Sequence, residues 1–123
     1  MIFSKKIRPI YSIICITGQN DINVPDFIPG KMISHTDSCI IISCASESDR
    51  STNIIFGWKQ EVENGTTPEF EGYISTGSKV INIYTAEKEL IAEKNVPKTR
   101  TKIMIWANDT TEPDEIRIGI VKE

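Results

Sequence analysis

The sequence predicts an all-β fold, a two-sheet antiparallel β-sandwich of about eight strands that forms a single domain over residues 1–123. Isoleucine dominates the apolar residues, and β-branched side chains favour pleated sheets over long helices. Short apolar runs recur along the chain with turn residues between them. The closing runs, 102–107 and 115–121, carry the clearest pattern, because every second residue from Ile116 to Ile120 is isoleucine, as in a strand with one buried face.

The N-terminal part of the chain predicts two strands joined by an irregular connection. Residues 7–17 form an apolar run that we expect to be the first strand. The prolines and the glycine within residues 22–32 predict an irregular connection with Phe27 and Ile28 tucked beneath it. Residues 38–45 are almost continuously apolar, which predicts a central strand that is covered on both faces.

The dipeptide Asn64-Gly65 predicts a β-hairpin. An Asn-Gly pair between two β-type runs is the strongest short hairpin signal, and here the runs are residues 53–62 and 69–76. Residues 79–85 follow as another alternating strand. We therefore expect three strands in close succession in this part of the chain.

The segment Thr85 to Asn95 is ambiguous. Thr85 could cap a short helix, since nearly all of the residues that follow are good helix formers. The alternative is a hairpin that turns at Glu87-Lys88. Only Ala86, Leu90 and Ile91 would form an apolar stripe, which is thin for a packed helix, so we favour strand.

Composition narrows the class of protein. The 39% hydrophobic and 25% charged residues are typical of a soluble globular protein, and the net charge of -3 argues against a nucleic-acid binder. Three cysteines cannot all pair in one chain, which favours a reducing compartment. No apolar run approaches the length of about 20 residues that spans a bilayer, and no cleavage site follows the N-terminal apolar run. We expect a cytoplasmic protein that binds neither nucleic acid nor membrane.

The sequence carries no catalytic motif. A nucleophilic triad would need a histidine, and the only one, His35, lies in a polar loop beside Asp37, where local turn hydrogen bonds are its ordinary role. Cys39 and Cys44 fall on one predicted strand with side chains on opposite faces, which prevents them from sharing a metal ion. Glycines occur singly, without a phosphate-binding loop. We therefore expect no enzyme activity, no metal and no cofactor.

Charged residues are distributed unevenly. Basic residues gather in residues 5–8 and 94–102, and acidic residues gather in residues 61–71 and 109–115. If the acidic segments share one side of the sandwich, they form a negative face that speeds association with a cationic partner; otherwise they form a solvated rim. The candidate carboxylates are Glu61, Glu63, Glu69, Glu71, Asp109, Glu112 and Asp114.

The C-terminal third, residues 79–121, resembles small bacterial inhibitors of nucleases. These include the competence-associated nuclease inhibitor family and some immunity proteins of contact-dependent growth inhibition systems. The pattern consists of an alternating strand at 80–84, a Val96-Pro97 step, a strand at 101–107, an acidic loop, and the closing run 115–120.

This resemblance implies an immunity protein that acts in the producing cell's cytoplasm. Such a protein binds and neutralises a cognate bacterial toxin domain, a cationic nuclease with ribonuclease favoured, by covering its basic active site with the acidic face. The aromatic anchors of that contact would be Trp58 and Tyr73, whereas Trp106 is expected to pack in the core.

Two other classes of function stay open. In a ligand- or carbohydrate-binding module, exposed rings such as Trp58 and Tyr73 would stack on sugars. In an enzyme, carboxylates facing each other across the predicted hairpin, such as Glu61 and Glu71, would act as general acid and base. The enzyme is disfavoured, because charged residues on a hairpin more often serve solvation.

Overall fold

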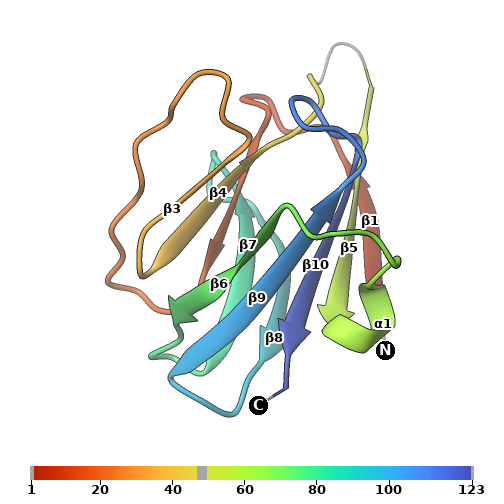
Figure 1. Cartoon of the computed structure of the whole chain (residues 1–123). Coiled ribbons are helices and arrows are strands. Elements are labelled where there is room, and N and C mark those ends of the chain that lie inside the picture. Colours follow the sequence, from red (N-terminus) through yellow and green to blue (C-terminus); the bar gives the residue numbers. More distant parts are fainter. Residues whose placement is uncertain (1, 47–49, 123) are drawn as a thin grey trace.

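Two five-stranded sheets make up the structure, a computed structural model that describes residues 2–46 and 50–122 (Figure 1). The strands are β1 (Phe3–Ile7), β2 (Ile13–Thr17), β3 (Ile33–His35), β4 (Cys39–Ser43), β5 (Thr52–Trp58), β6 (Phe70–Ser75), β7 (Val80–Thr85), β8 (Leu90–Asn95), β9 (Arg100–Ala107) and β10 (Glu115–Val121). Within the described residues, α1 (Lys59–Val62) is the only helix. Sheet A has the order β1-β5-β10-β9-β6, and sheet B has the order β3-β4-β2-β7-β8. The all-β sandwich expected from the sequence is confirmed.

The core lies between the sheets and is built largely of isoleucine. Ile54, Ile105 and Ile118 of sheet A and Ile14 and Ile42 of sheet B belong to one buried cluster with no exposed surface. Each of these strands alternates between this core face and an outer face, which is the period that the sequence showed most clearly in β10. The chain is rich in isoleucine because these side chains fill the one core that the two sheets share.

The described residues form ten strands, not eight, because β1 lies almost wholly before the expected strand 7–17, β2 forms the second half of it, and a short strand was missed. The run 7–17 is interrupted after Ile7 by a turn in which the Ser12 N–H donates to the Pro9 carbonyl at 3.0 Å. Ser12 itself has a positive φ of 57°. The turn sends the chain from β1 in sheet A to β2 in sheet B. The second addition is β3, a strand of only three residues after the irregular connection.

The expected hairpin around Asn64-Gly65 is wrong. The segment before it ends in α1, and β6 pairs with β9 instead of β5. The Asn64 side chain accepts hydrogen bonds from the Thr66 N–H at 3.2 Å and the Thr66 hydroxyl at 2.6 Å. Gly65 has a φ of 82°, so the dipeptide does form a turn, but one within a loop.

The segment Thr85 to Asn95 contains a strand, as favoured. It forms the end of β7, a tight turn and then β8, and β7 pairs antiparallel with β8. Lys88 takes a positive φ of 68° in the turn, and the Thr85 hydroxyl accepts a hydrogen bond from the Glu89 N–H at 3.2 Å. The same Thr85 that could have capped a helix therefore closes a hairpin.

One pairing departs from the antiparallel expectation. β10 runs parallel to β5, with Ile118 opposite Phe56, whereas its other neighbour, β9, is antiparallel. A parallel pair needs a long crossover, and here residues 59–114 lie between the two strands. As a result, the start of β5 and the β9–β10 loop lie at one end of sheet A, and α1 lies at the other.

Both sheets have partly covered outer faces. On sheet A, α1 and the loop after it cover Trp106, whose indole N–H donates to the Thr66 carbonyl at 3.0 Å and whose side chain packs with Val62. Trp106 is only 3% exposed, as its expected core role requires. On sheet B, residues 18–32, called the strap below, run beside β2 and β4.

Candidate functional site

The carboxylates of the expected acidic face do not gather in one place. Glu61 and Glu63 belong to α1 and its C-terminal end, next to the last residue of β5. Asp109, Glu112 and Asp114 lie in the β9–β10 loop at the opposite end, since Glu115 pairs with Asn53 near the start of β5. The seven residues of β5 separate the two groups by roughly 20 Å.

The third acidic pair lies along an edge of sheet A. Glu69 precedes β6, and its N–H donates to the Ile105 carbonyl at 2.8 Å, near the end of β9 that leads into the acidic loop. Glu71 lies in β6 opposite Met104. The sequence-predicted set is therefore spread over two ends and one edge of the same sheet.

Several of these carboxylates are engaged within the chain. Glu63 pairs with Lys59 at 3.4 Å, and Glu71 pairs with Lys102 at 2.7 Å. The Glu61 side chain accepts the Trp58 N–H at 3.0 Å at the start of α1. These three groups stabilise local structure, so less of their charge is available to a partner.

The acidic loop is fixed by Asn108 and Arg50. The Asn108 side chain donates to Asp114 Oδ1 at 2.6 Å and accepts the Asp114 N–H at 3.2 Å. Arg50 pairs with Asp114 Oδ2 at 3.1 Å and donates to the Glu112 carbonyl at 2.9 Å. The hydrogen bond from Asn108, and then the charge of Arg50, hold the pKa of Asp114 below its usual range. The loop therefore presents Asp109 and Glu112 from a fixed backbone.

The two predicted aromatic anchors are covered by cations. Trp58 is half-buried, and the ammonium groups of Lys94 and Lys122 lie 4.8 and 4.5 Å from its ring centroid. The Arg100 guanidinium lies 4.4 Å from the ring centroid of Tyr73. Stacking on a sugar requires an open ring face, so this arrangement does not favour the carbohydrate-binding alternative.

An exposed apolar group that the sequence did not predict lies at the acidic-loop end of the sandwich. Tyr11 is 66% exposed in the turn before β2, and Phe27 is 55% exposed in the strap. Ile10, Val24 and Ile28 beside them are exposed as well. The expectation that Phe27 and Ile28 are tucked under the strap is therefore wrong. Together these side chains make an apolar rim on a surface that is otherwise polar.

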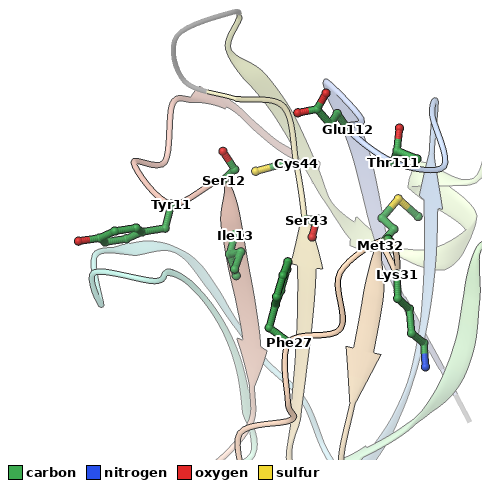
Figure 2. A pocket seen from close by; sticks show the side chains of 11 residues that line it. Tyr11, Ser12, Ile13, Phe27, Lys31, Met32, Ser43, Cys44, Thr111 and Glu112 are labelled. Carbon is green, nitrogen blue, oxygen red and sulfur yellow. The ribbon is translucent and has the colours of Figure 1, made fainter.

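Two hollows lie on either side of Phe27 in this apolar rim. The first, about 540 Å³, is lined by Tyr11, Phe27, Met32, Cys44 and Glu112, among others (Figure 2). Figure 2 shows Glu112 and Thr111 of the acidic loop on the opposite side of this hollow from Tyr11. The apolar rim and the acidic loop therefore border the same hollow.

The second hollow, about 660 Å³, lies between the strap and the outer face of sheet B. Its lining is mostly apolar and includes Phe27, Val24 and Ile41 together with two thiols, Cys15 and Cys39. The strap is held beside the sheet by the Asn23 N–H, which donates to the Ser38 hydroxyl at 2.8 Å. Sequence reasoning missed this surface because an irregular segment rich in proline gives no period from which exposure can be inferred; the clustering of apolar residues between those prolines was the available signal.

Within the described residues, no three His, Cys, Asp or Glu side chains lie close enough together to hold a metal ion. In the same part of the chain, no helix has the length and apolar character to cross a membrane.

Comparison with known proteins gives one full-length likeness. No protein-family model and no curated protein sequence matches the chain. Among solved structures, it is similar to the crystal structure of ComJ from Bacillus subtilis, an inhibitor of the DNA degrading activity of NucA. The superposition covers 100% of this chain and 99% of ComJ, with a TM-score of 0.68 and 14% sequence identity. The two chains share a fold. In ComJ, that fold belongs to an inhibitor.

Proposed function

We propose that this protein is a nuclease inhibitor that forms a one-to-one complex with a cognate nuclease and covers its active site. The observation that carries the proposal is the likeness to ComJ over the whole length of both chains. The net charge of -3 supports it, because nuclease active sites that bind phosphate are cationic and attract an acidic protein. We further propose that the nuclease is a bacterial toxin and that the inhibitor acts in the cytoplasm as its immunity protein.

The docking surface that we propose is the end of the sandwich where the apolar rim meets the acidic loop. Protein interfaces combine a buried apolar centre with a polar rim, and aromatic side chains supply much of the binding energy. Tyr11 and Phe27 provide the apolar centre, and the nearby hollows can receive side chains of the partner. Asp109 and Glu112 would occupy the positions of substrate phosphates against the cationic residues of the nuclease. Lys31 also lines the first hollow, so this end carries a basic side chain as well as the acidic side chains of the loop.

This proposal divides the acidic residues expected from the sequence into two roles. Asp109 and Glu112 would contact the partner directly, and Asp114 would hold their loop in place. Glu61, Glu63 and Glu71 already have partners within the chain and would contribute to long-range attraction. Glu69 lies along the edge between the two groups.

The partner is tested by co-expression with the product encoded immediately upstream of the gene. The expected result is a co-purifying protein that arrests growth when expressed alone, degrades nucleic acid, and loses both effects when this chain is present. Assays with DNA and RNA substrates identify the activity; the likeness to ComJ makes DNA the first substrate to try, and ribonuclease activity is the alternative expected from the sequence. If the upstream product has no nuclease activity that this chain blocks, the proposal fails for that pair.

The docking surface is tested by substitution. We expect the double substitution Tyr11→Ala with Phe27→Ala to weaken binding by about 2 kcal/mol or more, roughly 30-fold, because both exposed rings lose their contacts. Tyr73→Ala, which removes an exposed ring from the outer face of sheet A, is the matched control and should leave the affinity nearly unchanged. If Tyr73→Ala weakens binding and the double substitution does not, the nuclease docks on the surface predicted from sequence instead.

A further inference from the structure

A small hollow at the other end of the sandwich is bordered by basic side chains. It encloses about 250 Å³, and its floor includes Trp58 at the end of β5 and Pro97 in the β8–β9 loop. The cationic residues that line it are Lys98, Arg100, Lys102 and Lys122. They come from that loop, from the start of β9 and from the residue after β10, so the fold gathers them from separate segments.

Most of these cations have no carboxylate partner. Lys102 pairs with Glu71 at 2.7 Å. Lys94 and Lys122 lie over the Trp58 ring, and Arg100 lies over Tyr73. Within residues 2–46 and 50–122, no carboxylate forms an ion pair with Lys94, Lys98, Arg100 or Lys122. Aromatic rings are the neighbours of Lys94, Arg100 and Lys122 where acids would be expected.

This arrangement is electrostatically unusual for an acidic protein. The chain carries a net charge of -3, yet within the described residues the ion pairs of this group of cations are limited to Lys102 with Glu71. Like charges held close together repel, and an anion bound among them would relieve the repulsion. The net charge of the whole molecule argues against nucleic-acid binding, but it does not describe the local excess of positive charge around this hollow.

We propose that this hollow is a binding site for a phosphate group. Arg100 lines the hollow, and its planar guanidinium would leave the Tyr73 ring to bind two phosphate oxygens at once. The ammonium groups of Lys98 and Lys122 can act as point charges on the other oxygens. Trp58 and Pro97 exclude water on one side, which strengthens these interactions. The site lies at the end of sheet A opposite the acidic loop, and it does not depend on the proposed nuclease complex.

Binding would change the surroundings of Trp58. When phosphate enters, the ammonium group of Lys122 turns towards the anion and away from the ring, 4.5 Å from which it otherwise lies. The phosphate can come from two sources, a free phosphate or nucleotide, or the backbone of a single-stranded nucleic acid. Aromatic rings set among cations occur in sites for either source.

The experiment titrates the full chain, at constant ionic strength, with inorganic phosphate in one arm and a single-stranded oligothymidylate of about ten nucleotides in the other. Tryptophan fluorescence and calorimetry report binding. We expect a saturable change in signal with at least one of the two probes. In Trp58→Phe the fluorescence change should disappear, because only Trp106 still emits. Saturation by phosphate identifies the free ion or nucleotide as the source, and saturation by the oligonucleotide alone identifies a strand.

The side chains are assigned with two matched double variants. Lys98→Gln with Lys122→Gln should weaken binding at least tenfold. Lys5→Gln with Lys6→Gln removes the same charge from exposed sites on β1 and should leave affinity within about twofold. The proposal is overturned if neither probe saturates, with phosphate taken to about 20 mM, or if both double variants weaken binding equally.

Discussion

The three cysteines occupy different environments. Cys15 and Cys39 face the hollow under the strap, and their thiols are hydrogen-bonded to each other. This hydrogen bond from Cys39 lowers the pKa of the Cys15 thiol and raises that of Cys39. Burial raises the pKa of Cys44 to about 11. Cys15 is also the only one of the three that is not fully buried.

We expect Cys15 to react first with an alkylating reagent. The thiolate is the nucleophile, so a lowered pKa and partial exposure both raise its rate near pH 8, whereas Cys44 stays protonated and covered. The measurement is mass spectrometry of peptides after timed exposure of the folded protein to iodoacetamide. In urea the three thiols should react at similar rates. Equal labelling of Cys15 and Cys44 in the folded protein would contradict the assignment.

At Gly119, close packing of a distant helix leaves no room for a side chain. A Cβ atom there would lie 3.0 Å from the Lys59 Cα, 3.0 Å from Trp106 and 3.1 Å from Val62. The helix α1 thus crosses β10 directly above this residue. In the sequence Gly119 was only a residue alternating with isoleucine, because nothing local to it shows that a distant helix will lie on it.

We expect Gly119→Ala to lower the free energy of unfolding by about 1–3 kcal/mol, since α1 backbone and buried side chains must move. Gly57→Ala is the control. Its added Cβ would meet chiefly the end of the Glu61 side chain at 3.1 Å, which can shift slightly and still accept the Trp58 N–H, so a loss under about 1 kcal/mol is expected. Urea denaturation of both variants measures the difference, and equal effects would mean that α1 is not tightly seated.

At the scale of elements, local signals predicted strands well and their partners poorly. The alternation in β10 and the thin apolar stripe after Thr85 both led to strands that are present. Asn64-Gly65 led to a wrong hairpin, because a dipeptide can require a turn without requiring that the flanking segments pair. Here the Asn64 side chain accepts a hydrogen bond from the Thr66 N–H and so stabilises the turn without strand pairing. In the sheet, β10 and β9 lie between β5 and β6.

The acidic loop should loosen in acid. The pKa of Asp114 is lower in the folded protein than in the unfolded chain, so its contribution is complete above the unfolded pKa and disappears as pH falls through the folded pKa. The window therefore lies at and below the ordinary range of an aspartate. Hydrogen exchange of the Asp114 amide, which donates to the Asn108 side chain, measures the loosening.

Arg50→Ala tests the same loop at neutral pH. The substitution removes the ion pair with Asp114 and the hydrogen bond to the Glu112 carbonyl. We expect faster exchange of the Asp114 amide and, if the loop contacts the nuclease, weaker binding by severalfold. Lys59→Ala, which breaks the exposed pair with Glu63, is the control for a surface ion pair outside the loop and should change neither.

Across the whole molecule, each end of sheet A carries its own group of like charges, although Arg50 and Lys31 lie near the acidic group and Glu61 and Glu63 lie near the basic one. The acidic loop lies at one end of sheet A and the basic hollow at the other, although the sequence suggested a single acidic face. The sequence could supply the charged segments, but their places depend on the parallel pairing of β5 with β10, which joins residues far apart in the chain. The exposure of Tyr11 and Phe27 likewise depends on where the strap lies, and no local pattern encodes it.

The positions of the acidic loop and the basic hollow predict how removing charges from each end should change the rate of association with the nuclease. Asp109→Asn with Glu112→Gln should lower the association rate and its dependence on salt, because these carboxylates face the cationic partner. Lys98→Gln with Lys122→Gln, at the far end, should leave the association rate unchanged or raise it. Stopped-flow association at several ionic strengths measures both. A lower rate in the lysine variant would place the basic end in the complex.

The position of β10 has a consequence for synthesis. This strand is the last to be made, yet it lies in the middle of sheet A, between β5 and β9. While the chain is still on the ribosome, β1 can pair with β5 and β6 with β9, but the two pairs have nothing to join them until residues 115–121 emerge. Sheet A is therefore completed only after residues 115–121 have left the ribosome, and until then the nascent chain exposes two incomplete half-sheets.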